Sequence, residues 1–170
     1  MAVLEIVTVP HPVLRRKAEP IRDEEFGPEL ERLAHDMIET MRAAPGVGLA
    51  APQVNISKRL IVVEYEDEEE GIPHQLYAVA NPRIVRVSPR RVWGVEGCLS
   101  IPGMLGEVER AYAITVVGRT PLGQPLRLDL EGWVARIFQH EIDHLNGILF
   151  TDRARRVWRA SEEEEALTAV

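Results

Sequence analysis

The spacing of hydrophobic residues predicts two helices. The first begins at Pro28, because proline is favoured in the first turn of a helix, and it ends at Pro45-Gly46. The second covers about residues 131–145 and precedes Asn146-Gly147, which suits a left-handed C-terminal cap. Its hydrophobic residues lie on nearly all sides, so we expect this helix to be buried in the centre of the domain. The hydrophobic positions are Leu30, Leu33, Met37, Met41 and Ala44 in the first helix, and Trp133, Val134, Ile137, Phe138, Ile142 and Leu145 in the second.

Short segments with the composition of β-strands lie between the two helices. Turn signals separate them, among them Ser88-Pro89, Gly118 and Thr120-Pro121-Leu122-Gly123. Strands clustered between two helices indicate an α+β fold rather than a βαβ alternation. We expect mainly antiparallel strands packed around the buried central helix, with the other helix N-terminal to the sheet. The predicted strands are residues 60–65, 75–80, 83–87, 111–117 and 126–130.

Composition narrows the class of protein. The chain has 170 residues, which favours a single domain over residues 1–170, with residues 153–170 as a C-terminal extension. A formal net charge of −7 argues against a protein that coats nucleic acid. One cysteine excludes an intrachain disulfide and fits a reducing compartment. We find no signal peptide and no hydrophobic run near the roughly 18 residues of a membrane span, so we expect a cytoplasmic protein.

The strongest chemical signal is the sequence His140-Glu141-Ile142-Asp143-His144 on the second predicted helix. Two histidines four residues apart project from the same face of a helix, so both imidazoles can reach one metal ion. Glu141 can then approach a water molecule at the metal and act as general base and general acid. A structural metal site, or a hydrogen-bonded pair of core histidines, is the alternative interpretation.

A catalytic site of this kind needs a third protein ligand. The metallopeptidase extension H-E-x-x-H-x-x-G-x-x-H fails because Phe150 occupies its last position, and no histidine follows His144. Downstream glutamates occur only in the polar segment 162–165, which is unfavourable for a buried ligand. We therefore expect an upstream ligand, with Cys98 the foremost candidate, although a free cysteine is more often a small buried hydrophobic residue.

Two glycine-containing segments lie upstream of this helix. Cys98 belongs to Glu96-Gly97-Cys98-Leu99-Ser100, which is a weak signal alone because any strand that ends in a buried cysteine looks similar. The segment Gly46-Val47-Gly48-Leu49-Ala50-Ala51-Pro52-Gln53 is not a phosphate loop, since it has no lysine. It is either a close-packed turn of small residues or a backbone edge along which a substrate can lie, with Gln53 as an amide donor.

Together with Gln139-His140-Glu141-Ile142-Asp143-His144, these two segments resemble the three signature motifs of the peptide deformylase family, in the family's order. The sequence Pro10-His11-Pro12-Val13-Leu14-Arg15 also resembles the family's N-terminal segment. The resemblance covers nearly the whole chain. It implies hydrolysis of the N-formyl group from the initiator methionine of newly made polypeptides, which gives formate and a free amine.

The resemblance implies a metal centre. Cys98, His140 and His144 would bind one divalent metal ion, and Glu141 would be the catalytic acid and base. The native ion that the resemblance implies is Fe2+, with Zn2+, Ni2+ or Co2+ in purified forms. One thiolate and two imidazoles suit all of these ions, so the ligands alone do not select among them.

The resemblance also implies the contacts with substrate. The side chain of Gln53 and the backbone N–H of Leu99 would stabilise the oxyanion that forms during hydrolysis. Gly48 would hydrogen-bond the substrate backbone, and Gly97 would also contact the substrate. The pocket for the methionine side chain would be lined by Val47, Trp133 and Ile137.

Two positions depart from the pattern that the resemblance leads us to expect. Arg136 lies next to the pocket residues, where we expect an apolar side chain. Leu105 stands where many relatives carry an arginine that helps to position the substrate. Either Arg110 makes that contact here or the contact is absent.

Two other classes of protein compete with this interpretation. A zinc metallopeptidase shares the HExxH sequence but should lack the cysteine ligand. A non-enzymatic binding module stabilised by a metal should have no use for Glu141, because a purely structural site needs no general base. Release of formate from a formyl-methionine peptide would separate the three classes.

Several arginines lie around Trp158 in the C-terminal segment. Because a C-terminal extension can dock on the ribosome in this family, one interpretation is ribosome binding, and a solvated helix face is an equally good one. The expected partners are therefore nascent formyl-methionine polypeptides and the ribosome, with no membrane and no direct DNA binding. The arginines are Arg153, Arg155, Arg156 and Arg159.

Overall fold

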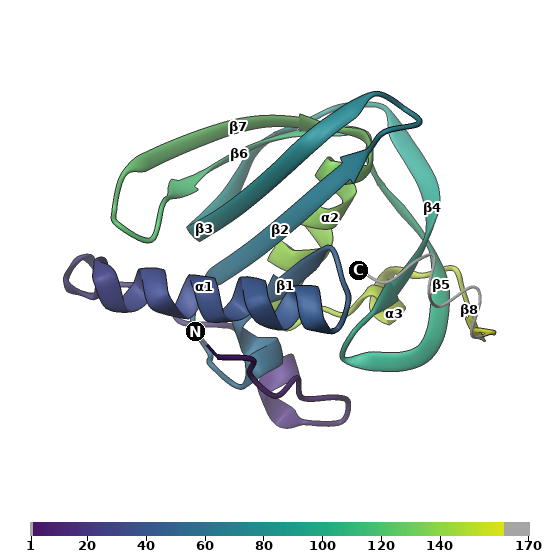
Figure 1. Ribbon diagram of the computed structural model, residues 1–170. Helices are drawn as coiled ribbons and strands as arrows, with labels where there is room; N and C mark the ends of the chain where they lie inside the picture. Colours follow the sequence, from purple (N-terminus) through teal and green to yellow (C-terminus); the bar gives the residue numbers. More distant parts are fainter. Residues whose placement is uncertain (1, 162–170) are drawn as a thin grey trace.

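Two antiparallel sheets enclose a central helix in the computed structural model, which describes residues 2–161 (Figure 1). The larger sheet has the strand order β1-β2-β3-β6-β7 and the smaller sheet β4-β5-β8. Neighbouring strands pair antiparallel throughout both sheets, which confirms the predicted α+β class. The strands are β1 (Gly48–Ala50), β2 (Leu60–Asp67), β3 (Ile72–Val87), β4 (Arg91–Cys98), β5 (Ile101–Ala111), β6 (Ala113–Arg119), β7 (Pro125–Glu131) and β8 (Arg156–Arg159).

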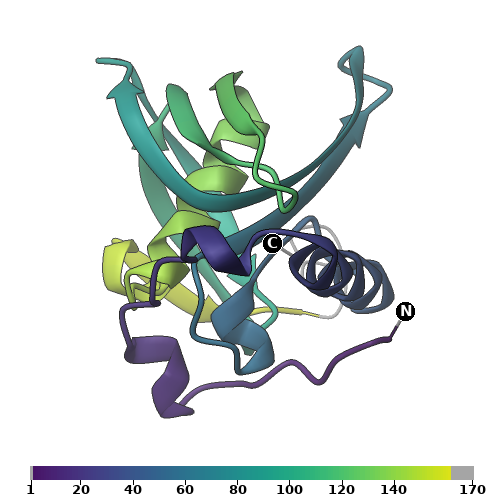
Figure 2. The same cartoon turned by 90° about the vertical axis from the view of Figure 1, so that its left-hand side faces the viewer.

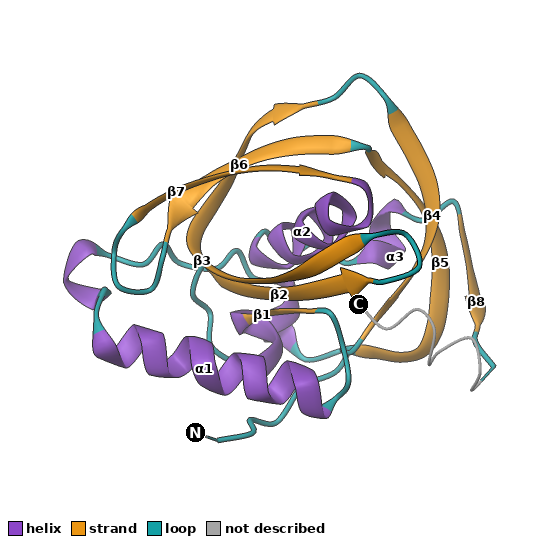
Figure 3. Ribbon diagram, turned by 45° about the horizontal axis from the view of Figure 1, so that its top comes forward, coloured by secondary structure: helices purple, strands orange, loops and turns teal. Residues whose placement is uncertain are grey.

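The second predicted helix, α2 (Gly132–Leu145), lies among the strands (Figure 3). It contacts strands of the larger sheet and β5 of the smaller one. Eleven of its 14 residues are buried, as the distribution of hydrophobic residues around it predicted. The other helices are α1 (Pro28–Ala43), α3 (Phe150–Arg153) and the short 3-10 helices η1 (Pro12–Arg15), η2 (Asp23–Glu25) and η3 (Ala51–Val54).

Strand β2 separates two hydrophobic cores. Successive side chains of a strand point to opposite faces. Ile61 and Val63 therefore pack into the core that contains α2, whereas Leu60 and Val62 pack into the core that contains α1. Figure 2 looks nearly along α1 and shows it apart from α2. The alternation along one strand thus fixes α2 in the interior and α1 on the outer face.

Two of the predicted strand boundaries are wrong. Residues 75–80 and 83–87 belong to one long strand, β3, because Asn81 accommodates an irregularity within it. Asn81 adopts a φ of 51°, which asparagine tolerates better than most residues, and its side chain hydrogen-bonds both backbone groups of Ile21. The predicted strand 111–117 spans the end of β5 and most of β6, with a bend at Tyr112 between them.

The sequence did not predict the smaller sheet, although this sheet carries Cys98. Its strands β4 and β5 contain glycines and buried charged residues, which obscure the alternation of hydrophobic and polar positions. The glycines have a steric reason. A Cβ added at Gly94 would lie 2.7 Å from Cζ of Arg136, and one at Gly106 would lie 2.8 Å from the ring of Phe150.

The arginine-rich C-terminal segment forms α3 and strand β8, so the interpretation as a solvated helix face is wrong. Strand β8 pairs with β5 and completes the smaller sheet. The glutamates at 162–165 and the rest of the predicted extension to 170 lie outside the described residues. Within residues 2–161, no helix has the length and hydrophobicity needed to span a membrane.

Candidate active site

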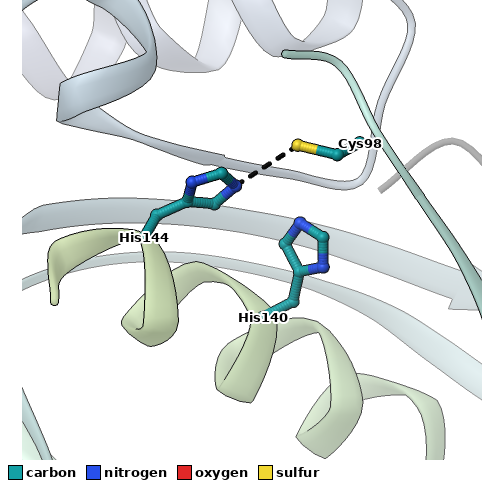
Figure 4. Close-up of side chains that lie close together, drawn as sticks. All are labelled: Cys98, His140 and His144. Carbon is teal, nitrogen blue, oxygen red and sulfur yellow. Dashed lines mark hydrogen bonds between the residues drawn. The ribbon is translucent and has the colours of Figure 1, made fainter. Parts of the chain in front are cut away.

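Three side chains with metal-binding atoms converge inside the fold (Figure 4). His140 and His144 lie one turn apart on α2, and Cys98 ends β4. All three are buried, and their ligand atoms lie within 4.8 Å of one another. Sγ of Cys98 is 3.3 Å from Nε2 of His144. Two such ligands of a tetrahedral zinc ion stand roughly 3.6 Å apart, given bond lengths of about 2.3 and 2.0 Å. The three residues therefore fit a single metal ion.

Several buried polar atoms at this cluster have no hydrogen-bond partner among the described residues. They include Nε2 of His140 and both carboxylate oxygens of Glu141. Buried polar side-chain atoms nearly always have a partner. Several unpaired atoms gathered at one place therefore indicate that a ligand binds there. Nδ1 of His140 is already hydrogen-bonded to Glu96, which leaves Nε2 as the atom that can bind a metal.

Glu96 of β4 is the residue that orients His140. Its carboxylate is completely buried and lies 2.9 Å from Nδ1 of His140. Burial opposes ionisation of Glu96, but hydrogen bonds from Arg110 and His140 outweigh burial and hold its pKa far below the usual value. Glu96 therefore stays ionised, and its oxygen accepts the Nδ1–H of the ring. Metal-binding histidines commonly have such a carboxylate partner.

The cluster favours one positive charge at its centre. Burial lowers the pKa of His144 well below 6.5, so this ring is neutral and its nitrogen is free to bind a metal. Burial also opposes charge on His140, but the neighbouring Cys98 and the hydrogen bond to Glu96 raise its pKa to about 10. A divalent cation at the same point would satisfy this preference for positive charge.

Glu141 lies beside the cluster, and neither of its oxygens has a hydrogen-bond partner in the part of the chain that the structure describes. Burial raises its pKa to about 7, against the opposing effect of His140. A general acid and base is most effective when its pKa lies near the working pH. Its Oε2 packs so closely against Gly48 that a Cβ at Gly48 would collide with it. This contact explains the glycine in the first of the three motifs.

Gln53 reaches the cluster from η3. Its Oε1 accepts a hydrogen bond from the backbone N–H of Ala50 (2.9 Å), which fixes the orientation of the amide. Its Nε2 therefore faces the second motif, where it lies 3.1 Å from Oγ of Ser100 and 3.6 Å from Sγ of Cys98. The structure thus places an amide donor next to the candidate metal ligand.

The first glycine segment forms β1 and passes close to the other two motifs. A Cβ at Gly46 would lie 2.9 Å from the side chain of Leu99, and one at Gly48 would lie 2.9 Å from a methyl group of Ile137. Small residues are thus required for this close approach. The close packing agrees with the interpretation of the segment as a turn of small residues. β1 is also an edge strand of the larger sheet, and a substrate along that edge stays a prediction.

The remaining candidate pocket residues lie at one hydrophobic core. Val47 and Trp133 are partly buried and pack against the core that contains Ile137. Trp133 also borders a cavity of about 200 Å³, together with Trp93. Gly97 pairs with Leu105 across the smaller sheet, one residue before Cys98.

The two arginines that the sequence analysis linked to these departures, Arg110 and Arg136, have internal partners. Arg110 is only 3% exposed and donates hydrogen bonds to Glu96 and Asp143, which favours the expectation that the substrate contact is absent. Arg136 also donates to Glu96, at 2.6 Å. This role of Glu96 was not predicted from the sequence. The one sequence feature that could have indicated it is that Glu96 and Arg136 are charged residues within segments that are otherwise buried.

A buried HExxH helix that faces a cysteine from a neighbouring sheet defines a metallohydrolase. The family model described as polypeptide deformylase matches residues 3–160 of this sequence. The chain therefore belongs to the peptide deformylase family. A peptide deformylase removes the N-formyl group from nascent polypeptides, and this chain is an enzyme of that kind.

Individual relatives agree with this assignment. The peptide deformylase of Symbiobacterium thermophilum is 52% identical over 165 residues, which cover 97% of this chain and 73% of that protein. That of Thermus thermophilus is 51% identical over 152 residues, which cover 84% and 77%. Among solved structures, the class I type b peptide deformylase from Acinetobacter baumannii has a TM-score of 0.84 at 40% identity, covering 90% of this chain and all of that chain. The Thermotoga maritima enzyme has a TM-score of 0.81 at 41% identity, with coverages of 92% and 100%.

Proposed function

We propose that this enzyme hydrolyses the N-formyl group of the N-terminal formylmethionine of newly made polypeptides, depends on one divalent metal ion and releases formate. One observation carries the proposal. Cys98, His140 and His144 converge in a buried cluster beside the unpaired carboxylate of Glu141. This arrangement supplies three metal ligands and one proton-transfer group, which is what hydrolysis of an amide requires.

The proposed ligands are Sγ of Cys98 and Nε2 of both histidines. Lewis acidity is the chemistry that the ion would supply, since it lowers the pKa of water toward neutrality and stabilises negative charge on a carbonyl oxygen. We propose Fe2+ as the native ion on the family resemblance. The ligand types also suit Zn2+, Ni2+ and Co2+.

Glu141 would move the proton in this reaction. With a pKa of about 7, its carboxylate can accept a proton from the attacking water and then, as the acid, donate it to the leaving amine nitrogen. Its oxygens have no hydrogen-bond partner among the described residues, so neither is committed to a structural contact. Proton transfer by a positioned group typically contributes about 10²- to 10⁴-fold in rate.

Gln53 and Leu99 would stabilise the oxyanion. The bond from Ala50 to Oε1 of Gln53 keeps Nε2 turned toward Cys98, where the formyl oxygen would develop its negative charge. The backbone N–H of Leu99 follows Cys98 directly in the chain and would be the second donor. Loss of one such donor typically costs about 10²- to 10³-fold in rate.

The polypeptide backbone would lie along β1. Among the described strands, β1 pairs only with β2 in the larger sheet, so its other edge has backbone groups that an extended peptide can hydrogen-bond. Gly48 would make that contact, with Gly97 of β4 also against the substrate. The methionine side chain would enter between Val47, Ile137 and Trp133.

The experiment that tests the function is an assay of formate release from formyl-Met-Ala-Ser with the metal-loaded enzyme. We expect formate and free Met-Ala-Ser in equal amounts. Cleavage of an internal peptide bond without formate would instead support a metallopeptidase. Metal binding without any turnover would support a binding module. Either result would refute the proposal.

Cys98→Ser tests the ligand set. We expect this variant to lose its metal during dialysis and to lose deformylation with it, because a hydroxyl is a much poorer ligand than a thiolate for these ions. Metal content and formate release are measured together, with a thermal melt to show that the variant is folded. A folded Cys98→Ser enzyme with unchanged metal and activity would remove Cys98 from the site.

We further propose that the enzyme works in the cytoplasm at the ribosome, through the arginines of its C-terminal segment. Arg153 and Arg155 are paired with Asp143 and Glu107, so Arg156 and Arg159, both exposed on β8, are the better candidates. The double variant Arg156→Glu/Arg159→Glu should cosediment less with ribosomes at low salt. Arg83→Glu/Arg86→Glu on β3 changes the net charge equally at another face. Equal loss in both pairs, or no loss in the first, would contradict docking by β8.

A further inference from the structure

We propose that Arg136 is a positioning residue for the metal centre, because it holds Glu96 in the place from which Glu96 orients the ring of His140. The inference rests on the proposed metal site and assigns it a residue that the three motifs do not contain. Among the described residues, the guanidinium of Arg136 donates hydrogen bonds to Glu96, Val108 and Val92 and to none of the candidate metal ligands, so we infer that it acts on them through Glu96.

The guanidinium of Arg136 is buried and donates three hydrogen bonds. It is 4% exposed, and its Nη1 donates to Oε2 of Glu96 (2.6 Å) and to the backbone carbonyl of Val108 (3.0 Å). Its Nη2 donates to the backbone carbonyl of Val92 (2.7 Å). Gly94 leaves the space for this group, since a Cβ there would lie 2.7 Å from Cζ of Arg136. Arg136 is thus clamped between β4 and β5.

The four hydrogen bonds of Glu96 divide between its two oxygens. Oε2 accepts from Nη1 of Arg136 and from Nε of Arg110 (2.8 Å). Oε1 accepts from Nη2 of Arg110 (2.8 Å) and faces Nδ1 of His140 (2.9 Å). With Oε2 held by two guanidinium groups, the carboxylate cannot rotate without breaking charged hydrogen bonds. Oε1 therefore keeps one direction toward the imidazole.

Arg110 alone does not fix this geometry. Its Nη1 is also bonded to Asp143 (2.7 Å), which in turn pairs with Arg153, so Arg110 is drawn toward a second carboxylate. Arg136 acts from a different direction. It lies four residues before His140 on α2, so the arginine and the histidine reach the same carboxylate from one helix. This closes a loop from α2 through Glu96 and back to α2.

A purely structural role for Arg136 makes different predictions. The hydrogen bonds to Val92 and Val108 link strands β4 and β5. Their loss would lower the free energy of unfolding whether or not it affected the metal centre. A positioning role requires, in addition, that metal affinity and the state of the His140 ring depend on Arg136. Arg59 provides a matched control, because it donates to the carbonyl of Leu145 at the other end of α2 and makes no hydrogen bond to Glu96 within residues 2–161.

The experiment compares Arg136→Met, Arg136→Lys and Arg59→Met with the parent enzyme. Affinity for Co2+ is measured by competition with a chelator, and the absorbance of the Co2+–thiolate bond reports that Cys98 is bound. In the Zn2+-loaded, 15N-labelled proteins, the Nδ1–H resonance of His140 reports its hydrogen bond to Glu96. Thermal melts show that each variant is folded. If Arg136→Met does not fold, Arg136→Gln takes its place, since it keeps a donor for the carbonyls and loses the charge.

We expect Arg136→Met, or Arg136→Gln in its place, to bind Co2+ about tenfold more weakly, within the range typical of groups that orient metal ligands. The Nδ1–H resonance of His140 should shift in the same variant. Arg136→Lys restores a cation beside Glu96 and should recover most of the affinity, and Arg59→Met should change neither readout. Parent affinity with an unchanged resonance in the folded Arg136 variant, or an equal loss in Arg59→Met, would overturn the inference. Absence of the thiolate absorbance in the parent enzyme would instead refute the proposed metal site.

Discussion

Glu96 and Glu141 are both completely buried beside the same candidate metal ligands, and their surroundings are opposite. Glu96 receives charged hydrogen bonds from Arg110 and Arg136 and has a strongly lowered pKa. Glu141 has no hydrogen-bond partner among the described residues, and burial raises its pKa to about 7. Two carboxylates at one site are therefore held in different states by their neighbours.

The difference shows how one fold assigns two tasks to the same chemical group. Desolvation alone favours a neutral acid, whereas nearby cations favour the ionised form. Cations around Glu96 make it a permanent acceptor that can hold a ring in place. Glu141 receives no such hydrogen bonds from the described residues, and burial outweighs the effect of His140 on its pKa, which leaves a group that can gain and lose a proton near neutral pH. The position of two arginines, Arg110 and Arg136, rather than the identity of the acid, separates the structural task from the chemical one.

The largest expected effect comes from removing the proton-transfer group. Glu141→Gln keeps the size of the side chain and leaves the three metal ligands intact, so the metal content should stay the same. We expect formate release from a formyl-methionine peptide to fall by about 10²- to 10⁴-fold, because an amide cannot transfer the proton. Activity close to that of the parent enzyme would show that another residue is the general base. It would also contradict the division of roles between Glu96 and Glu141.

A smaller loss of activity, with a different signature, is expected for Glu96→Gln. The amide cannot hold both arginines and the imidazole, so metal affinity should fall by about 10- to 100-fold. Arg110 and Arg136 would also lose their buried counter-ion, which typically costs about 3–5 kcal/mol of stability. Chelator competition and urea unfolding measure the two effects. If Glu96→Gln bound metal as tightly as the parent while Glu141→Gln lost it, Glu141 rather than Glu96 would be the residue that supports the metal ligands.

The smallest effect tests whether burial matters as well as the number of partners. Glu64 on β2 is also bonded to Arg42 and His74, but its side chain is 20% exposed. The hydrogen bond from Arg42 lowers its pKa from 4.5 to about 2, so its stabilisation is complete above pH 4.5 and is lost as the pH falls toward 2. Glu64→Gln should lower the free energy of unfolding by about 1 kcal/mol or less at pH 7.

The same variant should approach the stability of the parent enzyme as the pH falls below 4.5, because Glu64 of the parent then becomes protonated. Thermal melts of both proteins between pH 7 and pH 3 measure this convergence. A cost at pH 7 as large as that of Glu96→Gln would show that partner number, and not burial, determines the worth of these ion pairs.

The helices and the HExxH residues could be predicted because their signals are local. Helical spacing of hydrophobic residues identified α1 and α2, and the spacing of His140 and His144 on one helix face follows from helix geometry. Predicting Cys98 as the third ligand required elimination of downstream candidates and the family resemblance. Its distance of 3.3 Å from His144 depends on a strand 46 residues away in the chain.

The smaller sheet and the arginines around Glu96 could not be predicted in this way. Strand β4 alternates exposed and buried positions poorly, since Gly94 replaces a side chain to admit Arg136 and a buried carboxylate follows at Glu96. A charged residue on a buried face usually contradicts a strand assignment, and here its partners come from β5 and α2. Only the tertiary structure shows that the charges neutralise one another.

Strand β1 has a further consequence for the behaviour of the protein in a crowded solution. An unpaired strand edge can recruit the edge of another molecule and start aggregation, and proteins limit this hazard by keeping such strands short. β1 has only three residues, all buried, and η3 begins immediately after it. Three residues offer too few hydrogen bonds to hold a foreign sheet. The short length of β1 therefore limits the tendency of this edge to promote self-association.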